Sequence, residues 1–422
     1  METNFFSSLS ATEQKILQAH SKAILADNAD LQANLEAIIS VNCKKEKLTN
    51  LEFLRYCKGL KSLVCSSNKL KEVNFCQYFP QLEELDVSFN LIKDFSGLEK
   101  VPNLISLDLA YTKIKTIDFI KGLPRLRKLN ISYNPKIKNY SVLSELSDLV
   151  ELSVVENELR DLNWLQYAPK LEYLNLNWNY ISDLSGLRFT PHISRLSLYN
   201  CDLDNLIFLE NATNLTYLDV SKNLKITDLK PLKYAAKLQT LNIADTRPIS
   251  LDGVQNCTEL KALYAMSTHL TDISAIFEGA NKNLNILNLD FLRLTNLSGF
   301  DNLPNLTRFV AENSQLENIE GLKKSPNLEH INICWSKLIS LKGLENMHAL
   351  RELYVSGNKL NDILPIANCV RLQTLRIAQN QIFDLLGVEN LHKLEKVSLK
   401  YNQMTVKEVN YGKKCLPNCI FE

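Results

Sequence analysis

The sequence has few glycines, and they stand far apart. Of 422 residues only 12 are glycine, and the closest two are Gly343 and Gly357. Phosphate-binding loops of the GxGxxG and Walker types place two or more glycines within about six residues of each other. Both types are therefore excluded, and the nucleophile motif GxSxG is missing as well.

Metal-binding and redox spacings are also missing. The ten cysteines contain no CxxC pair, and the six histidines contain no HxxxH pair. These are the usual spacings of zinc ligands. The sequence predicts neither a metal nor a cofactor.

The chain has almost no net charge, since 48 Lys and Arg balance 47 Asp and Glu. General binders of nucleic acid and polybasic membrane anchors need a positive excess. The first residues, METNFFSSLSATEQK, have neither the basic start nor the apolar run of a signal peptide, and eighteen apolar residues never run together. We expect a soluble, cytoplasmic protein that binds no nucleic acid and no membrane and is monomeric alone. Export as an effector by another route stays open.

What the sequence does contain is a repeat. The segments LEELDVSFNLIKDFSGL, LEYLNLNWNYISDLSGL and LRELYVSGNKLNDILPI, which begin at Leu82, Leu171 and Leu350, align without gaps. The same frame starts seventeen times, and thirteen of the sixteen intervals are 22 residues long. One residue is added after Asn134, one after Asn223, and two near residues 278–283. The starting residues are Ile38, Leu60, Leu82, Leu104, Leu126, Leu149, Leu171, Ile193, Leu215, Leu238, Leu260, Leu284, Leu306, Leu328, Leu350, Leu372 and Leu394.

Each unit is expected to form one short strand and a return segment. Apolar residues at positions 1, 4 and 6 follow the alternation of a half-buried strand, and those at positions 11, 14 and 17 break it. A single unit cannot bury its leucines, so the units must stack. The predicted fold is an α/β repeat solenoid, a curved right-handed superhelix with a parallel β-sheet on its concave side.

Position 9 is predicted to satisfy buried backbone groups. It is Asn in nine units and Thr, Ser or Cys in six, and such side chains can bond to the backbone of a turn. Leu292 and Glu46, the two exceptions, are interpreted as structural variations. Seven cysteines occupy small apolar or position-9 sites, which predicts buried free thiols in a reducing compartment. For Cys415 and Cys419 a disulfide or a metal remains a minor alternative.

Helices should cap both ends of the stack. Ser10 and Glu13 form a capping-box pattern before a helical cap at residues 10–37, with a break at Asp27-Asn28, and Thr405 and Glu408 form another before a helix at 405–414. The last seven residues are expected to add one strand. The predicted organisation is a single solenoid domain, with residues 1–37 as N-terminal segment and cap, 38–404 as seventeen repeats and 405–422 as C-terminal cap. No segment remains for a catalytic domain, so we expect no enzyme.

The LxxLxLxxN frame with its 22-residue period resembles the short subclass of leucine-rich repeats. Bacterial internalins and the leucine-rich-repeat regulatory subunit of protein phosphatase 1 share this subclass. The ending CLPNCIFE resembles the terminal unit of many bacterial and protist leucine-rich-repeat proteins. The resemblance implies a protein-interaction module. By analogy with these two families, its partner would be a host receptor or a phosphatase catalytic subunit.

Candidate binding residues lie at positions 3, 5, 7 and 8, which face the concave side of the predicted sheet or its rim. Aromatic side chains with Arg and His are typical of protein-interface hot spots. Carboxylates share this face, which favours a protein partner over nucleic acid. The candidates are Tyr173, Trp178, Arg195, Tyr199, Tyr217, Tyr264, Phe291, Arg308, His330, Trp335 and Tyr354.

The main alternative is a structural scaffold or a self-associating repeat protein, in which the aromatics pack against each other along the rim. Phe89, Tyr111 and Tyr133 at position 8 of successive units suit that role. Rings laid along the rim would favour packing, and rings standing into the concavity would favour binding.

Overall fold

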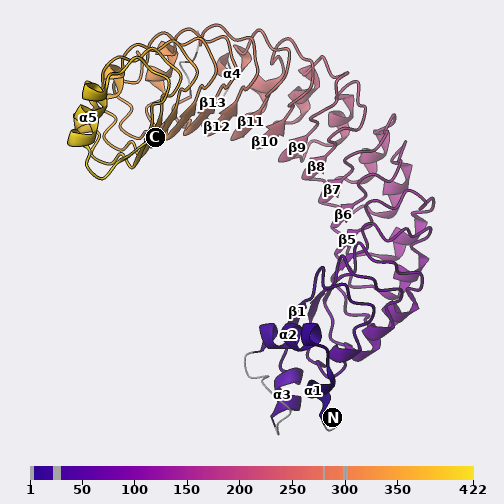
Figure 1. Ribbon diagram of the computed structural model, residues 1–422. Coiled ribbons are helices and arrows are strands. Elements are labelled where there is room, and N and C mark those ends of the chain that lie inside the picture. The colour runs from indigo at the N-terminus through magenta and orange to yellow at the C-terminus, as the bar shows by residue number, and fades with distance from the viewer. Residues whose placement is uncertain (1–3, 22–29, 279–280, 298–299, 301–302) are drawn as a thin grey trace. The chain divides into compact units, whose positions relative to one another are not determined.

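The computed structural model describes residues 4–21, 30–278, 281–297, 300 and 303–422. It consists of two compact units, Met1–Cys201 and Asp202–Glu422, which we call unit 1 and unit 2 and describe separately. Within each unit the strands line the concave side and the short helices lie on the opposite side (Figure 1). The leucine frame predicted both layers.

Unit 1 begins with a helical cap. Helix α2 (Ala11–His20) starts at Ser10, whose side chain accepts from the backbone of Glu13 while the Glu13 carboxylate accepts from the backbone of Ser10, so this capping box is confirmed. The other cap helices are α1 (Phe5–Ser8) and α3 (Leu31–Glu36). The expected break at Asp27-Asn28 lies outside the described residues.

Eight parallel strands form the sheet of unit 1, and each covers positions 3–5 of its repeat. They are β1 (Ser40–Asn42), β2 (Ser62–Val64), β3 (Glu84–Asp86), β4 (Ser106–Asp108), β5 (Lys128–Asn130), β6 (Glu151–Ser153), β7 (Tyr173–Asn175) and β8 (Arg195–Ser197). Residues at the same position of adjacent repeats pair with each other across the sheet, as Leu152 does with Leu174. The return segments contain 3-10 helices η1 (Glu52–Leu54), η2 (Asn74–Tyr78), η3 (Ser96–Lys100), η4 (Asp118–Gly122), η5 (Ser141–Glu145), η6 (Asn163–Tyr167) and η7 (Ser185–Phe189).

Unit 2 repeats this plan with ten parallel strands. They are β9 (Tyr217–Asp219), β10 (Thr240–Asn242), β11 (Ala262–Tyr264), β12 (Ile286–Asn288), β13 (Arg308–Val310), β14 (His330–Asn332), β15 (Glu352–Tyr354), β16 (Thr374–Arg376), β17 (Lys396–Ser398) and β18 (Ile420–Phe421). Its helices are η8 (Ile207–Asn211), η9 (Lys230–Tyr234), η10 (Val254–Asn256), α4 (Ala275–Glu278), η11 (Asn281–Asn283), η12 (Glu320–Lys324), η13 (Leu364–Ile366), η14 (Val388–Asn390) and α5 (Val406–Cys415).

The C-terminal cap agrees with the prediction except in its cap residue. Helix α5 and strand β18 are present, but the Thr405 side chain makes no capping hydrogen bond. The Glu408 oxygen Oε2 is buried and has no hydrogen-bond partner among the described residues. The second capping box is therefore wrong. The Thr405 carbonyl accepts from the Val409 backbone, so the helix begins without help from the two side chains.

Leucines and asparagines stabilise the stack as the frame predicts. Leu174 and Leu176 are fully buried. The Asn179 amide donates to the Val154 and Leu176 carbonyls at 2.9 and 2.7 Å, and its oxygen accepts from the Leu159 backbone at 2.9 Å. All ten cysteines are free, and the seven at core or position-9 sites are buried.

Candidate partner-binding surfaces

Position 8 projects its side chain from a left-handed turn that directly follows the strand. Every position-8 residue, from Lys45 (φ 64°) to Tyr401 (φ 61°), has a positive φ. This conformation costs roughly 1 kcal/mol or more for a residue with a Cβ atom, yet glycine occupies the position only once, at Gly357. The turn therefore does not dictate the aromatic side chains found there.

The position-8 rings of unit 1 stack along the rim. Phe89 and Tyr111 have ring centroids 5.1 Å apart with planes 15° from parallel, and Tyr111 and Tyr133 are 6.2 Å apart. Phe89 and Tyr111 remain 49% exposed. Rings that stack along the rim in this way are what we expect if the protein is a structural scaffold.

Two predicted residues of unit 1 meet on the concave face. The Arg195 guanidinium lies 4.7 Å from the centre of the Tyr173 ring. Arg195 and Lys128 both approach the Glu151 carboxylate, at 3.5 and 3.3 Å. Beside them lies a hollow of about 180 Å³ that also contains Asp108, and burial raises the pKa of this carboxyl above its ordinary value. The result is a shallow surface of mixed charge with one aromatic ring.

Trp178 and Tyr199 form a second pair in unit 1. Their ring centroids are 5.5 Å apart, with planes inclined by 60°. The Trp178 backbone donates to the Tyr199 carbonyl at 2.8 Å, so adjacent repeats fix the pair. Trp178 stays 41% exposed, and the pair presents aromatic surface at the rim.

Unit 2 has a denser network on its concave face. His330 Nδ1 lies 2.7 Å from Glu352 Oε2, and the Tyr354 hydroxyl donates to the same oxygen at 3.0 Å. The Arg376 guanidinium covers the Tyr354 ring at 4.4 Å, and the rings of His330 and Tyr354 meet edge to face at 5.1 Å. Since His330 is only 9% exposed, its main contribution to this surface is to position Glu352.

Burial and neighbouring charges determine the protonation of this network. Burial lowers the pKa of His330, and the nearby charge of Arg308 lowers it further. The Glu352 carboxylate acts to raise this pKa but does not outweigh them. Although burial acts to raise the pKa of Glu352, hydrogen bonds from His330 and Tyr354 hold it below its ordinary value. At neutral pH the network therefore presents a neutral imidazole and an ionised carboxylate.

The remaining candidates of unit 2 are distributed along its sheet. Tyr217 and Tyr264 are half-buried on strands β9 and β11, and Arg308 on β13 is paired in register with His330. Trp335 is 50% exposed, but its ring lies along the rim, because a Cβ atom at Gly357 would fall 2.5 Å from its Cε3 atom.

Phe291 stands apart from these residues. Its side chain is 57% exposed and borders a hollow of about 600 Å³ that His269 and Arg293 also line. The structure thus brings Tyr173 together with Arg195, Trp178 with Tyr199, and His330 with Tyr354, but it does not join all candidates into one cluster.

Sequence reasoning placed Glu151 on the concave face but missed the other charged partners in these clusters. Glu352 and Arg376 stand at positions 3 and 5 next to predicted residues. Comparing equal positions in adjacent repeats could have found them, because equal positions pair in a parallel stack.

The described thiols offer little nucleophilic chemistry. Burial raises the pKa of Cys57, Cys257 and Cys369 to about 12, so these thiols stay protonated at neutral pH. Among the described residues, His, Cys, Asp and Glu form no group of three that could hold a metal ion. In the same part of the chain no helix has the length and apolar character needed to cross a bilayer.

Comparison with known proteins gives a family match for part of the repeat region. Residues 58–100 and 102–145 match a family described as leucine rich repeats in two copies. No curated protein sequence matches the chain.

Solved structures share the fold at low sequence identity. A leucine-rich-repeat protein of Leptospira interrogans is 21% identical with a TM-score of 0.70, over 94% of this chain and 98% of that one. A chain of the Drosophila Toll–Spatzle complex is 17% identical with a TM-score of 0.68, over 89% of this chain and 60% of its own length. A chain of the mouse RP105/MD-1 complex is 19% identical with a TM-score of 0.66, over 90% and 78%.

Proposed function

Because the chain has the leucine-rich-repeat fold, we propose that it is a non-catalytic binding module whose concave faces hold a protein partner. The fold commonly serves protein interaction, and the Toll–Spatzle and RP105/MD-1 structures are complexes. Those chains are less than 25% identical to this one, so they support the fold alone. The case for binding rests on this chain's own side chains.

The network around Glu352 supports this proposal best. Tyr354 is held on one side by the Arg376 guanidinium and on the other by its hydrogen bond to Glu352. An aromatic side chain that is already ordered loses little conformational entropy when a partner covers it. The network therefore has the features of an interface anchor.

The charges on these faces indicate the class of partner. Glu151 stands with Lys128 and Arg195 in unit 1, and Glu352 stands with Arg376 in unit 2. A nucleic-acid surface would interleave aromatics with cations, and these carboxylates would repel phosphates. A protein that carries charges of both signs fits better.

The structural alternative keeps one specific observation in its favour. Phe89 stacks on Tyr111, and Trp335 covers Gly357, so these position-8 rings have packing roles. We therefore assign binding to Tyr173, Arg195, Tyr264, Arg308 and Tyr354, and we treat the rim rings as supports of the repeat edge.

Partner capture from the native cell lysate tests this function. One bait is the wild-type chain, and another carries Tyr264→Ala, Arg308→Ala and Tyr354→Ala. A matched control carries Ile339→Ala and Phe383→Ala, two apolar side chains outside the strands that are 57% and 53% exposed. We expect a protein that the wild type and the control retain and the triple variant loses. Equal retention by all three baits would refute the concave site.

A further inference from the structure

One edge of unit 1 carries a column of cations that the concave site does not use. The column consists of the position-12 residues of five successive repeats, counted without the residue inserted after Asn134. They are Lys71, Lys93, Lys115, Lys138 and Arg160, and all are exposed. The Lys93 backbone donates to the Lys71 carbonyl at 2.9 Å, so the first two side chains leave directly adjacent backbones.

Four carboxylates lie near this column in the sequence, namely Glu72, Asp94, Glu158 and Asp161, but none pairs directly with its cations in the described part of the chain. None of its five side chains forms an ion pair there. Like charges on neighbouring backbones repel each other, and such pairs destabilise a fold. The column therefore carries an electrostatic cost that an anionic ligand would remove.

The repeat does not require cations at this position. In unit 2 position 12 contains no Lys or Arg. Its residues there are Asp204, Thr227, Ile249, Thr271, Thr295, Glu317, Ile339, Asn361, Phe383 and Thr405. In unit 1 the same position is basic in five successive repeats, and Thr49 and Ser182 stand on either side of that run.

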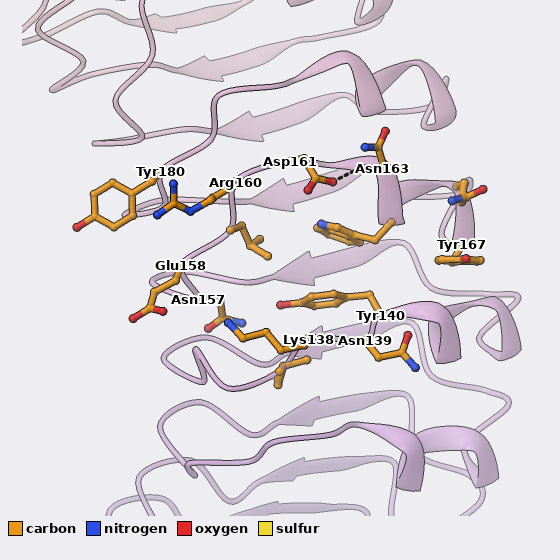
Figure 2. Close-up of a pocket in the computed structure, with 14 residues that line it drawn as sticks. Lys138, Asn139, Tyr140, Asn157, Glu158, Arg160, Asp161, Asn163, Tyr167 and Tyr180 are labelled. Carbon is orange, nitrogen blue, oxygen red and sulfur yellow. Dashed lines mark hydrogen bonds between the residues drawn. The ribbon is translucent and has the colours of Figure 1, made fainter.

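The cations border two grooves. A groove of about 880 Å³ contains Lys71, Lys93 and Lys115, together with Lys113, Lys136 and a single carboxylate, Asp94. That carboxylate already accepts from the Ser96 backbone at 2.9 Å. A second groove of about 580 Å³ contains Lys138 and Arg160 together with two carboxylates, Glu158 and Asp161 (Figure 2). The first groove is therefore strongly basic.

The second groove holds two buried polar atoms without well-formed hydrogen bonds. Tyr140 and Trp164 are only 5% and 9% exposed, and their rings stack at 4.8 Å. Within the described residues, the Trp164 Nε1 atom has no hydrogen-bond partner, and the Tyr140 hydroxyl has none of good geometry, although the Asn157 side chain lies near enough to lower its pKa. Buried polar groups in proteins are nearly always hydrogen-bonded to protein or to ordered water, so two adjacent exceptions leave two donors that a ligand or water can engage.

The geometry shows what this ligand must offer. In Figure 2 the Tyr140 hydroxyl points toward the side where Asn157 and Lys138 lie. Burial raises the pKa of Tyr140 to about 12 even though Asn157 acts in the opposite direction, so the hydroxyl keeps its proton. Indole Nε1 can only donate. The ligand must therefore supply acceptor oxygens.

A second inserted repeat shows that the groove is not a by-product of the insertion. The unit at Leu215 also gains one residue, but Leu229 stands there in place of Tyr140 and Gly253 in place of Trp164. A Cβ atom at Gly253 would lie 2.3 Å from the Leu229 carbonyl oxygen, so the repeats touch at that point. The aromatic pair, rather than the insertion, distinguishes the groove of unit 1.

We propose that this edge of unit 1 binds an extended acidic peptide segment of a protein partner, with its carboxylates on the cation column and an acceptor oxygen on Tyr140 and Trp164. This site is separate from the proposed concave site. Single-stranded nucleic acid fits less well, because it needs free ring faces, whereas Phe95 stacks on Phe119 at 4.5 Å and Tyr140 on Trp164. A flat lipid surface would not reach donors recessed in a groove.

Fluorescence anisotropy with the full chain tests this proposal. The probe is a labelled, end-blocked peptide of alternating glutamate and glycine, and its control has glutamine in place of glutamate. We expect saturable binding of the glutamate peptide, and binding of the glutamine peptide weaker by about tenfold or more, since its carboxylates are absent. Equal binding of both peptides would overturn the proposal.

Three variants locate the site. Combined Lys71→Gln, Lys93→Gln and Lys115→Gln should weaken binding by about tenfold. The matched variant with Lys230→Gln, Lys337→Gln and Lys359→Gln removes the same charge from exposed positions of unit 2 and should change binding less than about twofold. Equal losses in both would show a response to net charge alone and refute the site.

Tyr140→Phe distinguishes a ligand donor from a structural hydroxyl. We expect about threefold weaker peptide binding together with an unchanged or raised unfolding midpoint, because the hydroxyl makes no hydrogen bond of good geometry within the described residues. A lowered midpoint with unchanged binding would contradict the proposal. Poly-uridine or phosphatidylserine vesicles that bind more tightly than the glutamate peptide would overturn the assignment to a peptide.

Discussion

Units 1 and 2 have the same core but different edges. Leu174 in unit 1 and Leu241 in unit 2 are both fully buried at position 4. At position 12, however, unit 1 has a column of cations and unit 2 has none. Stacking fixes the core positions because each repeat must bury its leucines against the next. The edge positions are free of that demand, so their side chains can differ between the two units.

The two units also differ at position 9. Asn134, Asn157 and Asn179 follow one another in unit 1, whereas unit 2 has a run of residues without Asn, namely Thr246, Thr268, Leu292, Ser314 and Ser336. One amide both donates and accepts, whereas a threonine hydroxyl in this column donates to one carbonyl. The backbone around Asn134–Asn179 is therefore more strongly cross-linked at this column than the backbone around Thr246–Ser336, and amides return at Asn358, Asn380 and Asn402.

The largest expected effect concerns this column. Asn179→Leu should lower the free energy of unfolding by about 4 kcal/mol, because several buried backbone groups lose their partner at about 1–3 kcal/mol each. Thr268→Val, which removes a single bond of 2.8 Å to the Ala265 carbonyl, should cost about 1 kcal/mol. Urea unfolding measures both. If both variants lost the same free energy of unfolding, asparagine and threonine would stabilise position 9 equally, against our account.

The shared core should respond alike in the two units. Leu174→Ala and Leu241→Ala should each cost about 2 to 5 kcal/mol, because each leaves a cavity in the stack. Both values come from denaturant unfolding followed by circular dichroism. An unchanged midpoint for either variant would contradict the repeat frame.

Concave-face variants should separate affinity from stability. Tyr264→Ala in unit 2 and Tyr173→Ala in unit 1 should each cost about 2 kcal/mol in affinity for the captured partner and less than about 1 kcal/mol in stability. Calorimetric titration and thermal unfolding measure the two quantities. If only one variant loses affinity, the partner occupies that unit alone. Loss of stability without loss of affinity would support the structural alternative.

The smallest expected effect is a pH dependence that arises from His330 in unit 2. The pKa of His330 is lowered from its ordinary value of 6.5, so folding favours the neutral imidazole. Its stabilisation is present above about pH 6.5 and is lost as the pH falls below that value. The lowered pKa of Glu352 acts in the same direction at lower pH. Unfolding measured between about pH 7 and pH 5 should lose less stability in His330→Gln than in the wild type. If the free energy of unfolding falls equally with pH in both proteins, His330 does not cause the pH dependence.

The repeat architecture could be predicted from the sequence, because burial at positions 1, 4 and 6 leaves a periodic mark. The strand of each repeat, the buried thiols and the capping box at Ser10 followed from that pattern. The box at Thr405 did not form, because the motif marks a possible hydrogen bond and α5 begins without it. The prediction of one continuous solenoid domain stays a prediction.

The candidate sites were harder to predict. A net charge of +1 for the whole chain concealed the column from Lys71 to Arg160, because equal positions must be compared down the stack before it is visible. The burial of His330 depends on Glu352 and Tyr354 in the next repeat. The missing hydrogen bonds of Tyr140 and Trp164 leave no mark in the sequence, since they reflect packing rather than composition.

Hydroxyl-radical footprinting of the chain with its captured partner tests the central claim most directly. Mass spectrometry then reports the exposure of each tyrosine before and after binding. The account predicts that Tyr173, Tyr264 or Tyr354 on the strands becomes protected, whereas Tyr78, Tyr167 and Tyr234 on the 3-10 helices keep their reactivity. Protection of the 3-10 helix tyrosines with unchanged strand tyrosines would contradict binding on the concave faces.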